Sequence, residues 1–360
     1  MTERASTLLL HGIDTLQCAY YLRQEQPGDF DFAQLLQSRE SLRQLGRREG
    51  QPITLGGVPF LLHPHGTRSG YPFLLTSEDF RVECGEFLSP SFFVTFRSQA
   101  LWRESAHLLH EKLLTWARAV GFVPVKPEGL SRVDFAFDYA LPVVDFTEDH
   151  FVTRTNKDSQ HRENGHVQTF TFGRDAIVLR VYDKVAEVEQ QSDKVWFFVL
   201  WGQDRDVWRI EWQVRKDVLR EFGIVTFEDL RKCQGDLLRY LCEEHTTLRA
   251  PNEDQNRSRW PVHPLWRALQ ATVRELDQLG VCRFDGKNAA LEERLAQYAR
   301  SVYGYLKAVA AVSCVRQRKP LISEQEALAQ LTRRMWQLHD PLHWRVEVEK
   351  RIAEVQRGAW

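Results

Sequence analysis

Three segments of the chain alternate apolar and polar residues with a period of two, the pattern of a β-strand packed on one face. They are SRVDFAFDY (131–139), LRVYDK (179–184) and VWRIEWQVR (207–215). Successive side chains of a strand leave opposite faces of a sheet, so each segment separates its apolar residues from its charged ones. We therefore expect three strands that bury one face of a sheet and share a charged face on the other. The charged face consists of Arg132, Asp134, Asp138, Arg180, Tyr182, Lys184, Arg209, Glu211, Gln213 and Arg215.

Other segments complete a mixed fold. Strand-like runs lie at 71–96 and 169–184, a further apolar run lies at 195–201, and the polar segment 141–167 is expected to be a long hairpin loop. Amphipathic helical patterns occupy 101–120, 227–245, 265–279, 289–314, 324–339 and 343–357. The expected class is α+β: an antiparallel sheet that carries the charged face, with flanking helices, followed by an all-α C-terminal region.

The same patterns suggest three regions. Residues 1–70 form a mixed segment that packs on the core, residues 71–250 form the α+β domain with the charged face, and residues 251–360 form a helical C-terminal domain. The boundary is placed in the polar stretch Arg249 to Ser258.

Composition limits the class of protein. The chain is 43% hydrophobic and 27% charged, as expected for a soluble globular protein, and its net charge of −1 excludes a basic character of the whole chain. A partner with many negative charges would therefore need cations that are concentrated locally. The apolar run Leu8–Leu10 is too short for a signal peptide, and no run is long enough to cross a membrane. Six scattered cysteines without a C-x-x-C pair suggest reduced thiols and a cytoplasmic protein.

The charged face offers oxygen ligands for a hard divalent cation such as Mg²⁺ or Mn²⁺. On any one strand, a merely solvated face would look the same, but three such strands together indicate a site. Asp134 and Asp138 are four residues apart, roughly 13 Å along a flat strand, so they do not suit one ion together. We expect Asp134 and Glu211 to be the metal ligands, with Asp138 in support.

A tyrosine between two cations at alternate positions is unusual on a core strand. Arg180 and Lys184 flank Tyr182 on the charged face, and they are expected to lower the pKa of the phenol and favour the phenolate. A phenolate beside a bound metal could attack a phosphodiester, form a phosphotyrosine and release a 3′ hydroxyl. Asp183 points to the opposite face of a regular strand and is the weaker candidate.

Histidines provide a poorer metal site. His63 and His65 enclose Pro64, which argues against a central strand and for a loop. His107, His110 and Glu111 fall on a predicted helix, where solvent-facing flank positions are the expected explanation.

Four segments resemble one protein family. RVDFAFD, LRVYDKVAE, WRIEWQVR and NRSRWPVHPLW (256–266) resemble, in order, motifs of Rep_trans-type replication initiation factors. These are rolling-circle initiators of plasmids and filamentous phages, together with NicK- and MobT-like relaxases of integrative conjugative elements. The resemblance covers roughly residues 70 to 268, and the lack of a His-hydrophobe-His motif fits it.

The resemblance implies a metal-dependent enzyme that nicks and rejoins DNA. It places the nucleophile at Tyr182 and the metal ligands at Asp134 and Glu211. Arg180 and Lys184 are expected to assist the tyrosine because of their positions on the same strand face. It also implies DNA at a replication or transfer origin as partner and a host helicase as a further one; a homodimer stays open. One departure concerns the turn before the tyrosine strand: FGRDA (172–176) keeps Gly173 and Arg174 but lacks the hydroxyl residues of many members.

DNA contacts are assigned to arginines and one tryptophan, through phosphate pairing and base stacking. These candidates are Arg132, Arg174, Arg209, Arg215, Arg257, Arg259 and Trp260. The region 261–360 adds 16 lysines and arginines against 11 aspartates and glutamates, an excess that suits either DNA or a solvated surface.

Two other functions compete with nicking. A non-catalytic protein of the same descent would bind origin DNA and recruit a helicase, with salt-sensitive binding and no covalent adduct. A tyrosine recombinase also combines arginines and a lysine with a tyrosine, but it needs no metal and carries its tyrosine near the C-terminus in a helical domain. The residues leave open whether the protein would initiate replication or conjugation.

Overall fold

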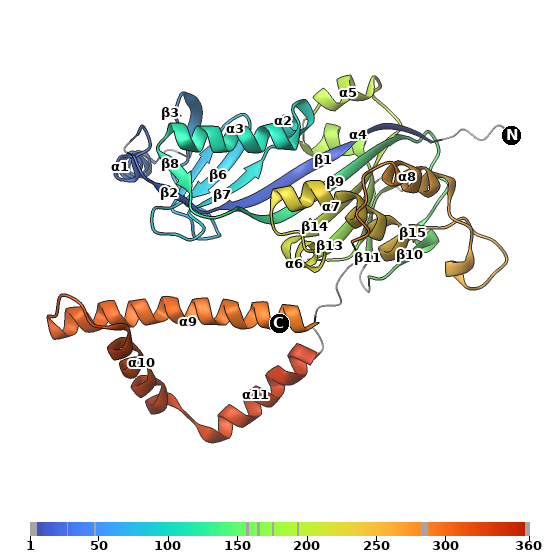
Figure 1. Cartoon of the computed structure of the whole chain (residues 1–360). Coiled ribbons are helices and arrows are strands. Elements are labelled where there is room, and N and C mark those ends of the chain that lie inside the picture. The colour runs from blue at the N-terminus through green and yellow to red at the C-terminus, as the bar shows by residue number, and fades with distance from the viewer. Residues whose placement is uncertain are drawn as a thin grey trace. The chain divides into compact units, whose positions relative to one another are not determined.

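The computed structural model describes residues 6–26, 28–46, 48–155, 158–163, 166–174, 176–192, 194–281 and 287–356. The chain forms two compact units, Met1–Phe284 and Asp285–Trp360 (Figure 1). The unit boundary follows residue 284, whereas the sequence placed it in the polar stretch after residue 248. The difference arises because Leu265, Trp266, Leu269 and Val273 are buried in the core of the first unit.

One antiparallel sheet organises the first unit. Within the described residues it has eleven strands. Their order is β11 (Asp158–Glu163), β12 (His166–Phe172), β13 (Ile177–Asp183), β14 (Val207–Arg215), β9 (Gly129–Ala140), β1 (Thr7–Tyr20), β7 (Phe92–Phe96), β6 (Phe80–Cys84), β5 (Phe73–Thr76), β4 (Val58–Leu62) and β3 (Gln51–Leu55). Because β1, β3 and β4 belong to this sheet, residues 1–70 are part of the fold rather than a segment packed on it.

Two small ladders and several helices complete the first unit. The ladders pair β10 (Phe151–Thr153) with β15 (Thr246–Leu248), and β2 (Leu22–Gln24) with β8 (Phe122–Pro124). The helices are α1 (Phe32–Gln44), α2 (Ser98–Arg103), α3 (Ala106–Ala119), α4 (Lys184–Glu187), α5 (Trp196–Trp201), α6 (Lys216–Glu221), α7 (Phe227–Arg239) and α8 (Pro264–Arg274). Short 3₁₀ segments are η1 (Glu148–His150) and η4 (Arg257–Arg259), and π-helical segments are η2 (Val188–Ser192) and η3 (Tyr240–His245).

Local capping explains where two helices begin. The Ser105 side chain accepts a hydrogen bond from the Leu108 backbone N–H at 3.2 Å, so the predicted helix 101–120 divides into α2 and α3 at this residue. Thr226 and Asp229 form a capping box at the start of α7.

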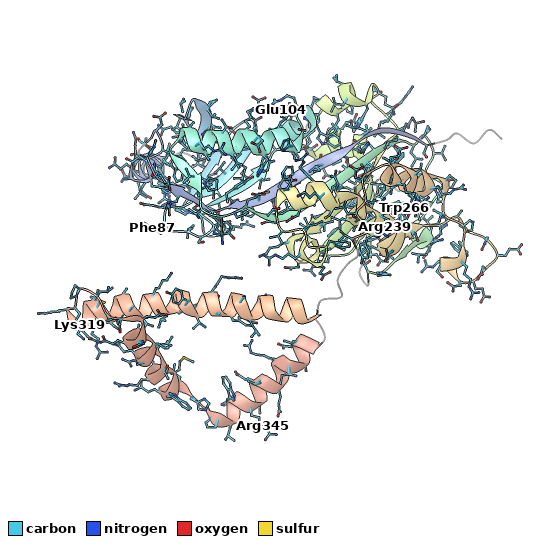
Figure 2. All side chains as sticks on the ribbon, viewed as in Figure 1. Phe87, Glu104, Arg239, Trp266, Lys319 and Arg345 are labelled. Carbon is cyan, nitrogen blue, oxygen red and sulfur yellow. The ribbon has the colours of Figure 1, made fainter. Side chains whose placement is uncertain are left out.

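The apolar face of the sheet is covered by α3, α7 and α8. Val133, Phe135 and Phe137 on β9 and Trp212 on β14 are all buried in the core. The Trp212 ring lies 6.3 Å from the ring of Trp266 on α8, which Figure 2 labels within the first unit. The alternation in these strands therefore predicted which side chains pack against helices.

Two segments differ from their sequence patterns. The region 141–167, expected to be a hairpin loop, contains η1, β10 and β11, and β10 pairs with β15 far along the chain. The apolar run 195–201 forms the helix α5, which packs on the charged face, where Phe197 and Trp201 become buried.

The second unit is all-α, as the sequence predicted. It contains α9 (Lys287–Gln317), α10 (Glu324–Leu338) and α11 (Pro341–Gln356). Its small core is formed by Leu306, Ile322 and Ala327. Among the described residues of the whole chain, no helix is both long and apolar enough to span a membrane.

Candidate active site

Strand register brings the charged face together. In the ladder between β13 and β14, Arg180 lies opposite Glu211 and Tyr182 lies opposite Arg209. In the ladder between β14 and β9, Glu211 lies opposite Ala136, with Gln213 opposite Asp134 and Arg209 opposite Asp138. Glu211 is therefore flanked on β9 by the two aspartates, one toward each end of the strand.

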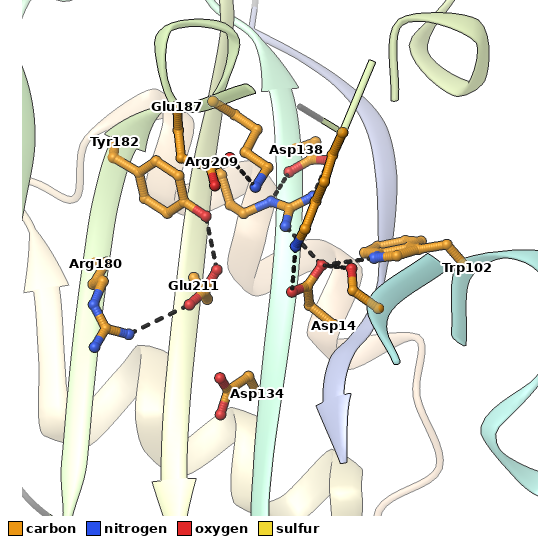
Figure 3. A network of polar contacts seen from close by, with 12 residues as sticks. Asp14, Trp102, Asp134, Asp138, Arg180, Tyr182, Glu187, Arg209 and Glu211 are labelled. Carbon is orange, nitrogen blue, oxygen red and sulfur yellow. Dashed lines mark hydrogen bonds and ion pairs between the residues drawn. The ribbon is translucent and has the colours of Figure 1, made fainter. Parts of the chain in front are cut away.

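The Tyr182 hydroxyl points at Glu211, as Figure 3 shows. It donates a hydrogen bond to Glu211 Oε2 at 2.8 Å. On the other side of the same carboxylate, Arg180 Nη1 lies 3.4 Å from Oε1. Tyr182 is 8% exposed and Glu211 is 9% exposed, so this contact is largely shielded from water. The expected convergence of phenol and carboxylate is thus present.

The ionisation of Tyr182 differs from the sequence expectation. Burial and the neighbouring Glu211 charge raise the pKa of the Tyr182 phenol well above its ordinary value, although Arg209 opposes the shift. Arg180 is directed at Glu211 and Gln213 rather than at the phenol oxygen. The predicted lowering of this pKa by Arg180 and Lys184 is therefore wrong for the structure as it stands, and the phenol is neutral near pH 7.

Lys184 has a partner of its own. Its side chain is 2% exposed, and Nζ lies 2.5 Å from Glu187 Oε2. Burial, together with the Arg209 charge, lowers the pKa of Lys184. The ammonium lies 5.5 Å from the centre of the Tyr182 ring, over its face. Lys184 thus packs against the tyrosine but does not bond to its hydroxyl.

Asp134 is a buried carboxylate with one basic neighbour. It is 2% exposed, and Arg132 Nε donates to Oδ1 at 2.8 Å while Nη2 contacts Oδ2. Burial raises the pKa of Asp134 to about 6; Arg132 opposes this shift, and the charge of Glu211 adds to it. The carboxylates of Asp134 and Glu211 thus lie near enough for the charge of Glu211 to act on Asp134.

Arg209 and Asp138 form a buried ion pair. Arg209 Nε donates to Asp138 Oδ1 at 2.6 Å, and Nη2 donates to Oδ2 at 2.8 Å. The indole N–H of Trp201 also donates to Asp138 Oδ2 at 2.8 Å. Neither charged residue is exposed at all. Arg209 therefore has no exposed surface for a DNA contact, which corrects that assignment. Both oxygens of Asp138 accept hydrogen bonds from fixed donors, and its supporting role at a metal stays a prediction.

Asp14 on β1 completes this ion pair, and the sequence did not identify it. Its Oδ1 accepts hydrogen bonds from Arg209 Nη1 at 2.9 Å, Trp102 Nε1 at 2.8 Å and the Ser98 hydroxyl at 3.0 Å. Although burial opposes it, the charge of Arg209 holds the pKa of Asp14 far below its ordinary value. The only hint in the sequence is an acidic residue inside a strand-like run near the N-terminus.

Aromatic rings shield the buried ion pair from solvent. The Arg209 guanidinium lies over the rings of Phe197, at 4.6 Å, and Trp102, at 5.6 Å. Phe197 comes from α5 and Trp102 from α2, so two helices cover this end of the charged face. In Figure 3, Trp102 lies beside Asp14, and Glu211 and Asp134 lie farther from its ring.

Asp134 and Glu211 are the two carboxylates on this face that could hold a magnesium or manganese ion. They occupy diagonal positions on adjacent strands, where backbone positions are about 7–8 Å apart and long side chains reach one another. Mg²⁺ is commonly held by one or two carboxylates together with substrate phosphate oxygens. Within the described part of the chain, no group of three or more His, Cys, Asp and Glu residues is placed to hold an ion. A metal site here would therefore combine the two carboxylates with oxygen atoms of the substrate.

The predicted DNA-contact residues fall into separate places. Arg215 ends β14 and is exposed, and it lies opposite Arg132 at the same end of the charged face. Arg174 is exposed in the turn between β12 and β13. That turn requires Gly173, whose φ is +92° and whose Cβ would meet the Ile177 carbonyl.

The candidates Arg257, Arg259 and Trp260 lie on the other face of the sheet. Arg257 donates to the Asp149 carbonyl at 2.6 Å, and the Trp260 indole donates to the Asp254 carbonyl at 2.6 Å. This segment is tied by Arg249 to the β10–β15 ladder. Phe151 of that ladder packs at 4.6 Å on Phe172, which faces away from Tyr182. Arg257, Arg259 and Trp260 are therefore not brought together with the tyrosine.

The remaining candidates have structural roles. Asp183, the weaker candidate ligand, caps α4 by accepting a hydrogen bond from the Ala186 N–H at 3.0 Å. His63 and His65 lie in a loop, as predicted. His110 is buried rather than solvated, and its Nδ1 lies 2.8 Å from the Tyr20 hydroxyl. The five described cysteines are free thiols, and Cys282 lies outside the described residues.

Comparisons with known proteins give a distant similarity to solved structures. No protein-family model matches the chain, and a search of curated proteins finds no match. A solved structure, that of the rolling circle replication initiator protein from Geobacillus stearothermophilus, is 18% identical and aligns with a TM-score of 0.44. The alignment covers 77% of this chain and 100% of that one. At this identity and TM-score, nothing about function carries over from that protein to this chain.

Proposed function

We propose that this protein is a DNA strand nicking and joining enzyme that uses Tyr182 as nucleophile and Mg²⁺ or Mn²⁺ as cofactor, in rolling-circle replication initiation or conjugative transfer. The observation that carries the proposal is the hydrogen bond from the Tyr182 hydroxyl to Glu211, on the sheet face that also holds Asp134. Three of the four motifs that resemble Rep_trans-type initiation factors also support it, because they contain Asp134, Tyr182 and Glu211.

Glu211 is the residue that prepares the nucleophile. Its carboxylate accepts the hydroxyl hydrogen of Tyr182, so it is positioned to take the proton as the phenol oxygen attacks phosphorus. A bond then forms between that oxygen and the phosphorus, and the bond to the 3′ oxygen of the preceding nucleotide breaks. The departing 3′ oxygen takes up a proton from solvent, and the 5′ phosphate remains on Tyr182. Joining is the reverse: a 3′ hydroxyl attacks the phosphotyrosine and releases the phenol.

Asp134 and Glu211 would hold the divalent ion. When bound, such an ion polarises the phosphodiester and offsets the charge that develops on its oxygens. Burial raises the pKa of Asp134, although Arg132 opposes the shift. A divalent ion beside this carboxylate would favour its charged form. Arg180 keeps the other oxygen of Glu211 directed along the sheet face.

Two cations beside the carboxylates, one exposed and one partly buried, would hold the DNA backbone. Arg215 is exposed at the end of β14, and Arg132 is 27% exposed in its side chain. Both lie at the Asp134 end of the charged face, where phosphate pairing would place a scissile bond near the carboxylates. The chemistry would be the same in replication and in conjugation.

One observation favours a second candidate function, a non-catalytic protein that binds origin DNA. Tyr182 is buried and neutral in the structure, as expected if it only packs and bonds within the sheet. Such a protein would bind DNA in a salt-sensitive manner without cleaving it.

An oligonucleotide cleavage assay distinguishes these functions. Pooled end-labelled single strands are incubated with the full chain and Mn²⁺, and wild type is compared with Tyr182→Phe. Nicking by the wild type and its loss in Tyr182→Phe support the proposal. Tyr21→Phe is the matched control. Lys126 Nζ lies 3.6 Å from the centre of the Tyr21 ring, and this contact does not need the hydroxyl group. Cleavage that persists in Tyr182→Phe would remove this residue as nucleophile, and binding without any wild-type cleavage would favour the second function.

A further inference from the structure

One row of side chains crosses seven neighbouring strands of the sheet on the charged face. Residues directly opposite one another in an antiparallel ladder project from the same face of the sheet. Arg215 of β14 lies opposite Arg132 of β9, and Arg132 lies opposite Gln17 of β1 on its other side. The pairing continues through β7, β6 and β5 to β4. The cross-strand row consists of Arg215, Arg132, Gln17, Thr95, Arg81, Thr76 and Leu61.

The cross-strand row is accessible to solvent over its whole length. The side chain of Arg81 is 43% exposed, that of Arg132 is 27% exposed, and Leu61 at the far end is 42% exposed. Arg215 is exposed, and the neutral polar members of the row are half-buried. A ligand could therefore contact the row along the surface of the sheet.

The helices near these strands pack on the other face. Phe32 of α1 lies 5.8 Å from the ring of Phe73 on β5, and Trp116 of α3 lies 5.2 Å from the ring of Phe60 on β4. Phe60 precedes Leu61 in its strand, so the two side chains leave opposite faces. The strands thus bury one face under helices and present the cross-strand row on the other.

The row combines cations with neutral hydrogen-bonding groups. Gln17 Nε2 donates to Thr95 Oγ1 at 3.3 Å, and Thr76 Oγ1 lies 2.9 Å from Nε2 of His63. Arg81 Nη2 lies 3.3 Å from Glu83 Oε1, a contact that is partly exposed. Exposed ion pairs of this kind hold their partners weakly, so the guanidinium can also bind another anion.

The spacing of the row suits an extended polyanion. At about 4.8 Å per strand, the six steps from β14 to β4 span about 29 Å, with arginines at β14, β9 and β6. Phe93 lies two residues before Thr95 on β7 and is a half-buried aromatic ring on the same face. Cations that follow a backbone, together with an aromatic ring for stacking, are the combination by which proteins bind single-stranded nucleic acid.

We propose that the cross-strand row binds a single DNA strand and leads it across the sheet, from the carboxylate site toward the β4 edge. Phosphates would pair with Arg215, Arg132 and Arg81, and a base would stack on Phe93. The inference rests on the proposed function, because Arg132 belongs to the row and also contacts Asp134 of the candidate active site. It adds a path for the substrate that extends well beyond the carboxylates.

Salt-dependent binding of a fluorescently labelled oligothymidine to the full chain tests the proposal. Anisotropy is measured without divalent metal, so the result does not depend on cleavage. Each phosphate contact with a single strand contributes about 0.7 to the slope of log affinity against log salt concentration. Arg81→Gln should therefore lower this slope by about 0.7 and weaken binding about fivefold in about 0.1 M salt, whereas Arg81→Lys should keep the slope.

Arg231 provides the matched control for Arg81. Its side chain is 48% exposed and pairs with Glu228 at 3.0 Å, but it belongs to α7 on the other face of the sheet. Arg231→Gln should bind oligothymidine like the wild type. Equal slopes for Arg81→Gln and Arg231→Gln, or an absence of wild-type binding, would overturn the proposal.

A gain of binding tests the same row without removing any contact. Leu61→Lys adds a cation at the β4 end, so the slope should rise by about 0.7 and binding should tighten about fivefold in about 0.1 M salt. Leu36→Lys is its control, because Leu36 is 44% exposed on α1, on the other face. No difference between these two variants, or equal competition by a blunt duplex, would contradict a single-strand path here. Binding that follows the row while no Tyr182 adduct forms would support the path and remove the nicking reaction.

Discussion

Asp138 and Arg209 face one another across β9 and β14 and form a two-point ion pair that is completely buried, with distances of 2.6 and 2.8 Å. Asp14 Oδ1 accepts a hydrogen bond from Nη1, the remaining nitrogen of the same guanidinium. Because Tyr182 lies directly opposite Arg209 on the other side of β14, this ion pair fixes the strand positions from which the tyrosine projects. Its role is to support the site rather than to touch substrate.

Removing Asp138 should therefore unfold the protein more easily. Asp138→Ala leaves Arg209 buried with Asp14 as its remaining carboxylate, and the expected loss in the free energy of unfolding is about 3–5 kcal/mol. Urea denaturation followed by circular dichroism measures it. Glu228→Gln, which affects an exposed pair with Arg231, is the control and should change stability by no more than about 0.5 kcal/mol. A fully stable Asp138→Ala that has lost only cleavage would favour Asp138 as a metal ligand.

The charged carboxylate of Asp134 should make the folded protein less stable near pH 7 than an uncharged side chain at this position would. The pKa of Asp134 in the folded protein is about 6, above its ordinary value of 3.8. The stability of the protonated form is therefore fully present below pH 3.8 and is lost as the pH rises through about 6. The free energy of unfolding of Asp134→Asn should then exceed that of the wild type by on the order of 2 kcal/mol at pH 8. The difference should vanish near pH 3. The measurement is urea unfolding across pH without divalent metal.

The exposed carboxylate of Asp204 is the control for that series. Asp204→Asn should leave the free energy of unfolding within about 0.5 kcal/mol of wild type at each pH. If Asp134→Asn were destabilising at pH 8, the bond to Arg132 would outweigh burial, and the carboxylate would be fully compensated without a metal.

Glu211 should be required for cleavage but not for folding. Glu211→Gln keeps an oxygen that can accept the Tyr182 hydroxyl but removes the charge that takes the proton, so the nicking rate should fall about 10²- to 10⁴-fold. Single-turnover cleavage with saturating oligonucleotide measures the rate. Glu83→Gln changes another buried glutamate of the same sheet and should cleave normally. Equal rates for Glu211→Gln and wild type would remove Glu211 from the mechanism.

Much of the sheet follows from the sequence because period-two alternation decides which face is buried. Val133, Phe135 and Phe137 could be assigned to the core, and Asp134, Tyr182 and Glu211 to one shared face, before any register was known. The prediction succeeded where the strands are regular and each side chain's face depends only on its position in its own strand.

The sequence could not show which charged side chains of this sheet face are buried. Arg209 and Arg215 lie on the same strand face and look alike in the pattern, yet the first is buried and the second is exposed. The difference comes from Asp14 on β1 and from the aromatic cover of α2 and α5, which are distant in the chain. α5 itself was not recognisable, since a short apolar run has the same composition in a buried helix and a strand. His110 was misplaced for a related reason, because its partner Tyr20 comes from β1.

The most direct measurement is mass spectrometry of the protein after incubation with single-stranded oligonucleotides and Mn²⁺, followed by nuclease and protease digestion. A peptide that contains Tyr182 and carries a 5′-linked nucleotide, absent without metal and absent from Tyr182→Phe, is the predicted result. A nucleotide attached to any other residue, or DNA cleaved while every Tyr182 peptide stays unmodified, would contradict the assignment of this phenol as the nucleophile.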